Sequence, residues 1–217
     1  MAIVETPGLR EFLHSYPKMA IRPSTGANLR LKGRFEFVAH HATEGSIQDD
    51  FALEIIVPRE FPKTLPRVIE TEGKIPRTGE YHINQTDNTL CLGSPLSLLL
   101  RLSKNPTLDG FAENCLVPYL FAIARKLRTG GPLPFGELAH GRPGILTDYA
   151  RLFGLKRTEH VKYALELLGM KKRRANKLPC PCGCRSRLGR CKFNLRLREF
   201  RPLASRSWFR KERLGLG

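Results

Sequence analysis

Four cysteines lie within twelve residues near the end of the chain, at Cys180, Cys182, Cys184 and Cys191. This spacing brings several sulfur atoms close together whatever the remaining residues do. Four thiolates so placed suit the tetrahedral sulfur coordination that Zn²⁺ prefers. Clustered thiols are more typical of metal binding in a reducing compartment than of a secreted disulfide framework, and a redox or disulfide pair is the alternative. The spacing therefore predicts a structural zinc site.

Positive charge is concentrated in the last third of the chain. Residues 1–150 hold 17 Lys and Arg against 16 Asp and Glu, whereas residues 151–217 hold 20 against 4. The first part is a near-neutral domain, and the last third is a polycation that favours acidic partners. The charge alone leaves open whether such a partner is nucleic acid or an acidic protein surface.

Composition indicates a globular chain without a membrane segment. Hydrophobic residues make up 41% of the 217 residues, enough for one sizeable core and an appendage. The first 19 residues lack the apolar stretch of a secretory signal, and the most apolar run, residues 95–102, is too short to span a bilayer. We expect a soluble cytoplasmic protein with no membrane partner.

The first half of the chain predicts a small antiparallel sheet. Leu29 to His40 alternates apolar and charged residues, which indicates a strand with one wet face. Phe51 to Val57 is apolar enough for burial on both faces, and Arg67 to Glu72 is a plausible third strand. Prolines at every fourth position between these two strands exclude helix and favour a stiff extended connection: Pro58, Pro62 and Pro66.

Helical spacing and breakers complete the predicted layout. Short helices are expected over residues 8–15 and 94–102. A longer helix is expected to follow, with Thr107 as its candidate cap and a kink or split at Pro118. Two more are expected over residues 145–153 and 159–168, the last capped by Thr158. The Gly- and Pro-rich stretch 129–134 is the clearest breaker. We expect a first domain over 1–130, a helical extension over 131–175, and a Cys-rich, basic region over 176–217 whose end from 193 is a frayed tail.

A polar loop over residues 81–93 ends in a single thiol. Cys91 lies between Leu90 and Leu92, with Asn84 and His82 seven and nine residues upstream. A thiolate here can attack an acyl group while the Asn amide donates to the developing oxyanion. The alternative is an inert core cysteine, since free Cys is among the most buried residue types. Cys115, on an apolar helical stripe, is predicted to be core.

The order of several short motifs resembles the ubiquitin-conjugating enzyme family over roughly residues 5 to 130. The motifs are the strand ending at Pro58, the Phe61-Pro62 and Leu65-Pro66 turns, His82-Ile83-Asn84, and Leu90-Cys91-Leu92. The family has Pro where this chain has Ile83, and one more residue between the Asn and the Cys. The cysteine cluster is similar to the short SEC-C zinc motif, except that Lys192 replaces its last ligand and Cys184 can supply the missing thiolate.

The resemblance implies an α+β fold, a meander with flanking helices, followed by a helical and zinc-binding extension. It further implies that Cys91 takes the C-terminal acyl group of a ubiquitin-like modifier from an activating enzyme and passes it to a target amine. Asn84 would stabilise the oxyanion and His82 would brace the loop, while Asp109 and His140 are further candidates for assisting the amine. The attached zinc motif suggests a bacterial-type member of a defence system.

Two other functions remain open. One is a non-catalytic module of the same fold that binds a ubiquitin-like protein, with nucleic acid or protein held by the basic zinc region. The other is a nucleic-acid binder in which the zinc and basic region dominate, whose affinity would fall steeply with salt.

Overall fold

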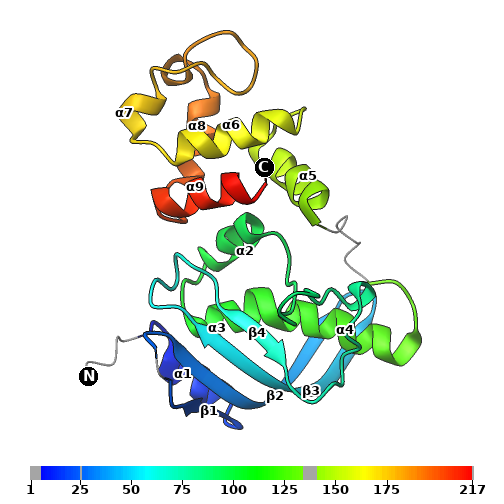
Figure 1. Ribbon diagram of the computed structural model, residues 1–217. Helices are drawn as coiled ribbons and strands as arrows, with labels where there is room; N and C mark the ends of the chain where they lie inside the picture. Colours follow the sequence, from blue (N-terminus) through cyan, green and yellow to red (C-terminus); the bar gives the residue numbers. More distant parts are fainter. Residues whose placement is uncertain (1–5, 25, 134–140, 217) are drawn as a thin grey trace. The chain divides into compact units, whose positions relative to one another are not determined.

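The structure is a computed structural model that describes residues 6–24, 26–133 and 141–216. The chain divides into two compact units (Figure 1). The first unit comprises Met1–Gly93 and Arg101–Glu137, and the second comprises Ser94–Leu100 and Leu138–Gly217. The second unit therefore takes one short segment from the middle of the chain.

The first unit contains an antiparallel meander, as the sequence predicts, but with four strands where three were expected. Its strands are β1 (Met19–Arg22), β2 (Leu29–His41), β3 (Gly45–Val57) and β4 (Arg67–Glu70), in the spatial order β1-β2-β3-β4. The longest ladder joins β2 to β3, where Phe35 pairs with Phe51 and Gly33 with Leu53. β3 begins six residues earlier than expected, and the edge strand β1 was not predicted.

Alternation explains the two faces of this sheet. Leu31, Phe35 and Phe37 on β2 are at most 5% exposed, while Lys32, Arg34 and Glu36 between them are charged. On the polar side Arg34 pairs with Asp50 at 2.5 Å. Part of β3 is buried on both faces, since Phe51, Ala52 and Leu53 are all buried, whereas Ile56 is only half-buried.

Helices cover the apolar face of the sheet (Figure 1). They are α1 (Leu9–Ser15), α3 (Leu108–Phe111), the π-helical turn η2 (Ala112–Leu116) and α4 (Val117–Thr129). The Thr107 hydroxyl caps α3 as predicted, accepting the Gly110 N–H at 3.0 Å. The interruption expected at Pro118 is the wide turn η2, which leaves room for a residue that has no N–H to donate.

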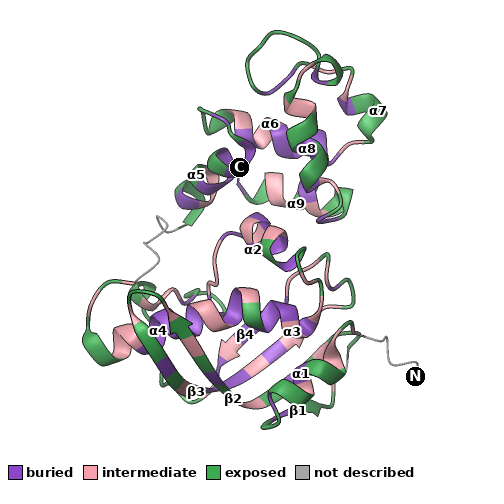
Figure 2. Cartoon of the chain, turned by 180° about the vertical axis from the view of Figure 1, so that it is seen from behind, coloured by how far each residue is buried: buried purple, intermediate pink, exposed green. Residues whose placement is uncertain are grey.

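The second unit is helical. It contains α5 (Gly141–Phe153), α6 (Glu159–Leu168), α7 (Lys172–Ala175), η3 (Leu188–Arg190), α8 (Phe193–Phe200), α9 (Arg206–Gly215) and most of α2 (Pro95–Leu102). Its core joins helices distant in sequence, since the rings of Phe153 on α5 and Phe200 on α8 meet edge to face at 4.9 Å. Figure 2 shows buried residues along α5, α6 and α8. The Thr158 side chain makes no cap for α6, so that detail of the sequence prediction is wrong.

The prediction of a frayed tail from residue 193 is also wrong, because this stretch contains the helices α8 and α9. Leu197 and Phe200 lie three residues apart on α8, Phe209 lies on α9, and all three are at most 1% exposed, so this end of the described chain is part of the core. The Ser205 hydroxyl starts α9 by accepting the Trp208 N–H at 3.1 Å. Among the described residues, none of the helices combines the length and the apolar character needed to cross a bilayer.

A candidate thiol site and a four-cysteine metal centre

The loop that carries Cys91 is a short hairpin attached to the edge strand β4. Ile83 and Leu90 form an isolated antiparallel bridge, and the Leu90 N–H donates to the Val68 carbonyl at 2.8 Å. The Cys91 N–H donates to the His82 carbonyl at 2.7 Å. The backbone at the thiol is therefore fixed from two sides.

Side chains within the loop hold its tip. The Asp87 carboxylate accepts both the N–H and the hydroxyl of Thr89, at 3.1 and 2.6 Å, and pairs with Arg67 at 2.9 Å. These hydrogen bonds from Thr89, helped by the Arg67 charge, lower the pKa of Asp87. Ile83 is 6% exposed and packs inward. Burial of Ile83 and the hydrogen bonds of the Asp87 carboxylate thus hold the loop.

Cys91 and Cys115 are the two thiols of the first unit, and they differ in accessibility. Cys115 is 1% exposed, and burial raises its pKa to about 11, so it is a core residue as predicted. Cys91 is half-buried. Burial raises its pKa too, although a hydrogen bond from the Gly93 backbone acts in the opposite direction. Cys91 is therefore the accessible thiol of this unit, and it is mostly protonated at neutral pH.

Tyr119 on α4 braces the loop, a role that sequence reasoning missed. Its hydroxyl donates to the Tyr81 carbonyl at 2.8 Å, one residue before the carbonyl that accepts the Cys91 N–H. Burial, then the nearby Cys91 and Glu70, raise the pKa of Tyr119. A neutral hydroxyl therefore lies near the sulfur. Lys126, about two helical turns further on, donates to the Glu80 carbonyl at 3.0 Å.

The other predicted residues have distinct surroundings. His82 adopts a left-handed backbone (φ 51°), which orients its carbonyl toward the Cys91 N–H. The exposed Asn84 donates one amide N–H to the Thr89 hydroxyl at 2.8 Å. Asp109 lies in the first turn of α3. Burial raises the pKa of Tyr16, and the charge of Asp109 raises it further. His140 lies outside the described residues.

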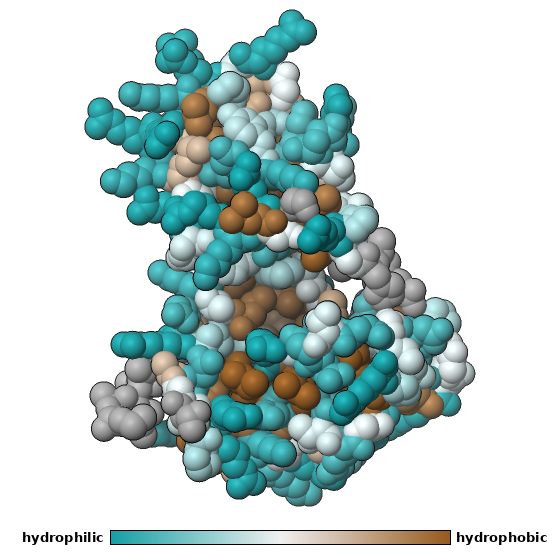
Figure 3. All heavy atoms as spheres, viewed as in Figure 1, coloured by the Kyte–Doolittle hydropathy of each residue, from teal (hydrophilic) through white to brown (hydrophobic). Residues whose placement is uncertain are grey.

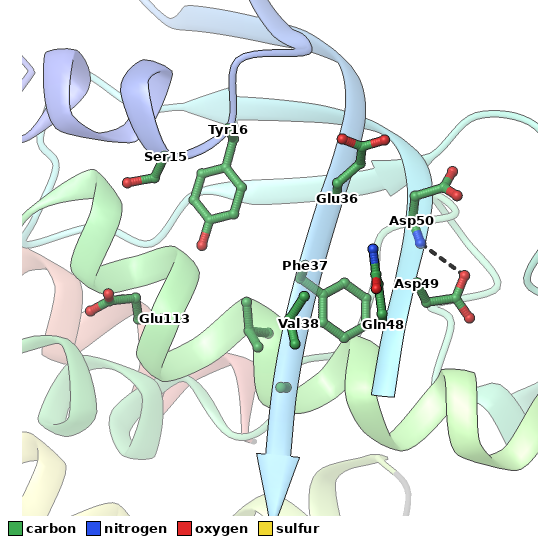
Figure 4. A pocket seen from close by; sticks show the side chains of 11 residues that line it. Ser15, Tyr16, Glu36, Phe37, Val38, Gln48, Asp49, Asp50 and Glu113 are labelled. Carbon is green, nitrogen blue, oxygen red and sulfur yellow. Dashed lines mark hydrogen bonds between the residues drawn. The ribbon is translucent and has the colours of Figure 1, made fainter. Parts of the chain in front are cut away.

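A separate hollow of about 860 Å³ is lined by residues from the end of α1, from β2 and β3, and from η2 and α4 (Figure 4). Glu36, Asp49, Asp50 and Glu113 line it, and Cys91 does not. Its acids are largely paired: Asp49 with Lys74 and Arg128, Asp50 with Arg34, and Glu36 with Lys18. Because these neighbours neutralise them, the hollow lacks an evident reactive group.

The four clustered cysteines form the second candidate site. Their sulfur atoms all lie within 4.8 Å of one another, with 3.2 Å between Cys180 and Cys182 and 3.6 Å between Cys182 and Cys191. Sulfurs bound tetrahedrally to one Zn²⁺ at ~2.3 Å are separated by about 3.8 Å. These distances are near that value and far beyond the ~2.05 Å of a disulfide. The cluster can hold a metal ion.

Local backbone geometry creates the cluster. The Cys180 N–H donates to the Ser186 carbonyl at 2.9 Å, and Pro179 pairs with Arg187, which closes a small hairpin. Gly183 and Arg185 take left-handed conformations at its turn (φ 83° and 60°). The Ser186 N–H and the neighbouring thiols lower the pKa of Cys184 to about 7. One sulfur of the cluster is thus readily ionised for metal binding.

Compared with protein-family models, curated proteins and solved structures, the chain gives no match. Its functional assignment therefore depends on the residues described above.

Proposed function

We propose that the protein is a ubiquitin-conjugating-like acyltransferase that carries a modifier as a thioester on Cys91. The observation that supports this most is the half-buried Cys91 at the end of a braced hairpin, while the other thiol of the unit, Cys115, is buried in the core. The meander, its covering helices and the position of the thiol after β4 agree with the order of elements that the sequence resemblance implies.

The reaction consists of two acyl transfers. The ionised sulfur of Cys91 attacks the thioester carbonyl on the activating enzyme, a new C–S bond forms, and the activating enzyme's sulfur leaves as a thiol after taking up a proton. A target amine then attacks the carbonyl carbon, a C–N bond forms, Cys91 leaves, and the extra amine proton passes to solvent. Exchange between thioesters is nearly isoenergetic, so placement of the reactants supplies most of what is needed.

The raised pKa of Cys91 fits the carrier role. A thiol of higher pKa is a poorer leaving group, so its thioester reacts less readily with stray nucleophiles. Acyl transfer then depends on an amine being held beside it. The half-buried sulfur also limits contact with water.

Three neighbouring residues take supporting roles in this proposal. His82 acts through its carbonyl, which fixes the Cys91 backbone, and Tyr119 positions the adjoining Tyr81. Asn84 uses one amide N–H on Thr89, and the amide group has a second N–H that can donate to the oxyanion.

The competing proposal is a non-catalytic module of the same kind that binds a ubiquitin-like protein. The raised pKa of Cys91 favours it as well, since little thiolate is present at neutral pH. The loading experiment below separates the two.

For the cysteine cluster we propose a structural Zn²⁺ held by Cys180, Cys182, Cys184 and Cys191. Four protein thiolates fill a tetrahedral shell and leave no position for substrate, which is typical of structural rather than catalytic zinc. The free thiols suit a reducing compartment, so we place the protein in the cytoplasm.

The test is a loading assay in which the protein is incubated with ATP and with a ubiquitin-like protein and its activating enzyme, both from the same organism. We expect a heavier band on a non-reducing gel that thiol reductant removes. The Cys115→Ala variant should keep this band and Cys91→Ala should lose it. A band that persists in Cys91→Ala contradicts the assignment of Cys91, and a wild-type protein that binds the modifier without forming the band supports the binding module.

A further inference from the structure

One stretch of the second unit is strongly basic and carries no acid. Between residues 171 and 192 there are nine Lys and Arg and no Asp or Glu. We call this stretch the basic segment; it comprises α7, the cysteine hairpin and η3. All nine cationic side chains are exposed: Lys171, Lys172, Arg173, Arg174, Lys177, Arg185, Arg187, Arg190 and Lys192.

Backbone hydrogen bonds make the basic segment one structural piece. The Leu188 N–H donates to the Leu178 carbonyl at 2.8 Å, and the Gly189 N–H donates to the Asn176 carbonyl at 3.0 Å. These bonds hold the end of the cysteine hairpin against the residues that follow α7. The cations of α7 and those of the hairpin therefore lie on one connected segment. A metal ion bound by the cysteine cluster would stabilise this segment further.

The four acidic residues of the last third, 151–217, have partners outside the basic segment. Three of the four pair with arginines outside the basic segment: Glu159 with Arg157 at 2.5 Å, Glu166 with Arg213 at 3.3 Å and Glu199 with Arg196 at 3.1 Å. The fourth, Glu212, accepts the Tyr149 hydroxyl at 2.6 Å. In the part of the chain that the structure describes, the nine cations have no acidic partner within ion-pair distance.

The uncompensated charge is large even with metal bound. Four thiolates and one Zn²⁺ carry a net charge of −2, which leaves the basic segment with about +7. In Figure 3 hydrophilic side chains extend outward from the region of α7 and α8. A field of this sign and density attracts polyanions.

The surface suits phosphate better than an acidic protein. Protein interfaces are centred on buried aromatic or apolar anchors. The large apolar side chains that the described structure exposes, Ile21, Val38, Leu195 and Leu214, all lie outside the basic segment. Contacts to a nucleic-acid backbone need only Lys and Arg. The segment also contains no aromatic residue that could stack on bases.

We propose that the basic segment binds the sugar–phosphate backbone of a nucleic-acid duplex without reading its sequence. This activity is separate from acyl transfer at Cys91 and is measured without it. Each phosphate neutralised should release counterions, so the affinity should fall steeply with salt.

The experiment measures fluorescence anisotropy of a labelled 20-base-pair DNA duplex of mixed sequence, titrated with zinc-loaded, full-length protein. NaCl is varied from 50 to 300 mM, and an RNA duplex and a second DNA sequence are run in parallel. The test variant replaces Lys171, Lys172, Arg173 and Arg174 together by Gln, which keeps helix propensity. We expect the slope of log K against log salt to fall in magnitude by about 3 to 4, and the affinity at 100 mM salt to fall at least about tenfold.

A matched control removes the same charge from the first unit. Arg59, Lys63, Arg77 and Lys104 are exposed and are replaced together by Gln. We expect this control to change the affinity less than about threefold, since it retains the phosphate contacts. A second variant, with Arg185, Arg187 and Arg190 replaced by Gln, should weaken binding as the α7 variant does. Zinc content and circular dichroism verify that each variant is folded.

Several outcomes would overturn the proposal. They are no binding at 50 mM salt, equal losses in the control and α7 variants, or a strong preference between the two DNA sequences. Poly-glutamate that competes as well as the duplex at equal charge would assign the surface to an acidic protein instead.

Discussion

Replacing Tyr149 by Phe should selectively destabilise the second unit. Tyr149 is 0% exposed, and its hydroxyl makes two hydrogen bonds in the core. It donates to Glu212 on α9 at 2.6 Å and accepts the Leu96 N–H of α2 at 3.1 Å. One hydroxyl therefore joins α5 to the last helix and to the segment that follows Cys91.

The size of the effect follows from the two partners left behind. The Phe ring keeps its packing against Phe153, so no cavity of consequence forms. The Leu96 N–H and the Glu212 carboxyl lose their partner, and each unsatisfied buried group costs about 1–3 kcal/mol. Burial already raises the pKa of Glu212, and this acid can lower its cost by taking up a proton. We therefore expect a loss of about 2–4 kcal/mol in the free energy of unfolding, or a melting temperature about 10–20 °C lower for a unit of this size.

The chain contains its own probe for this experiment. Trp208 is the single tryptophan, and its ring lies 5.2 Å from that of Phe209 in α9. Its fluorescence during urea unfolding reports the second unit alone. The control is Tyr163→Phe, whose half-buried hydroxyl donates to the Pro179 carbonyl at 3.2 Å and should contribute less than about 1 kcal/mol. If the two variants unfold at the same urea concentration, the hydroxyl of Tyr149 does not join the helices as described.

Three further predictions concern the candidate sites. The rate of alkylation of Cys91, measured by mass spectrometry of its peptide, should rise about tenfold per pH unit from pH 7 and still be rising at pH 9. The reason is that the thiolate reacts and burial raises the pKa of this thiol, so a plateau below pH 8 would contradict the prediction. Asn84→Ala should leave loading of Cys91 intact and slow its discharge to amine about 10²-fold. Thr89→Val removes the hydroxyl that accepts from this amide and donates to Asp87, but it keeps the Asn84 amide and should slow discharge far less; equal losses in both variants would make Asn84 a structural residue. Cys184→Ser should lower the zinc content of dialysed protein below one ion per chain, whereas Cys115→Ser should not. Wild-type protein should release zinc below about pH 5, where the thiolates are protonated. An unchanged zinc content in Cys184→Ser would remove Cys184 from the ligand set.

The sheet and the cysteine cluster were predictable because their signals are local. The alternation from Leu29 defines one face of β2 without reference to any other strand, and spacing alone brings Cys180 close to Cys182. The edge strand β1 was missed because only Met19 of its four residues is buried, which is too little for a period of two to show. The terminal helices were missed because many arginines mask the few apolar residues, such as Phe200 and Phe209, that anchor them.

The braces of the thiol site depend on contacts between residues far apart in the sequence. Tyr119 and Tyr81 are separated by 38 positions, and no pattern near Tyr119 distinguishes it from other helix residues. The same holds for the carboxylate of Asp148, which accepts hydrogen bonds from Ser94 and from Ser97, the latter at 2.6 Å. Burial alone would raise the pKa of Asp148, but these bonds and Arg151 lower it. Only the folded chain reveals that the residues after Cys91 belong with α5.

The segment Ser94–Leu100 gives the protein an order of assembly. The ribosome delivers Leu96 more than a hundred residues before Glu212, so the Tyr149 hydroxyl finds both partners only after Glu212 has been made. A fragment ending after α4 would leave α2 without Tyr149, and one beginning at α5 would lack α2. Neither half can be expressed alone with its native contacts, and a truncation that removes α9 would also disturb the segment that follows Cys91.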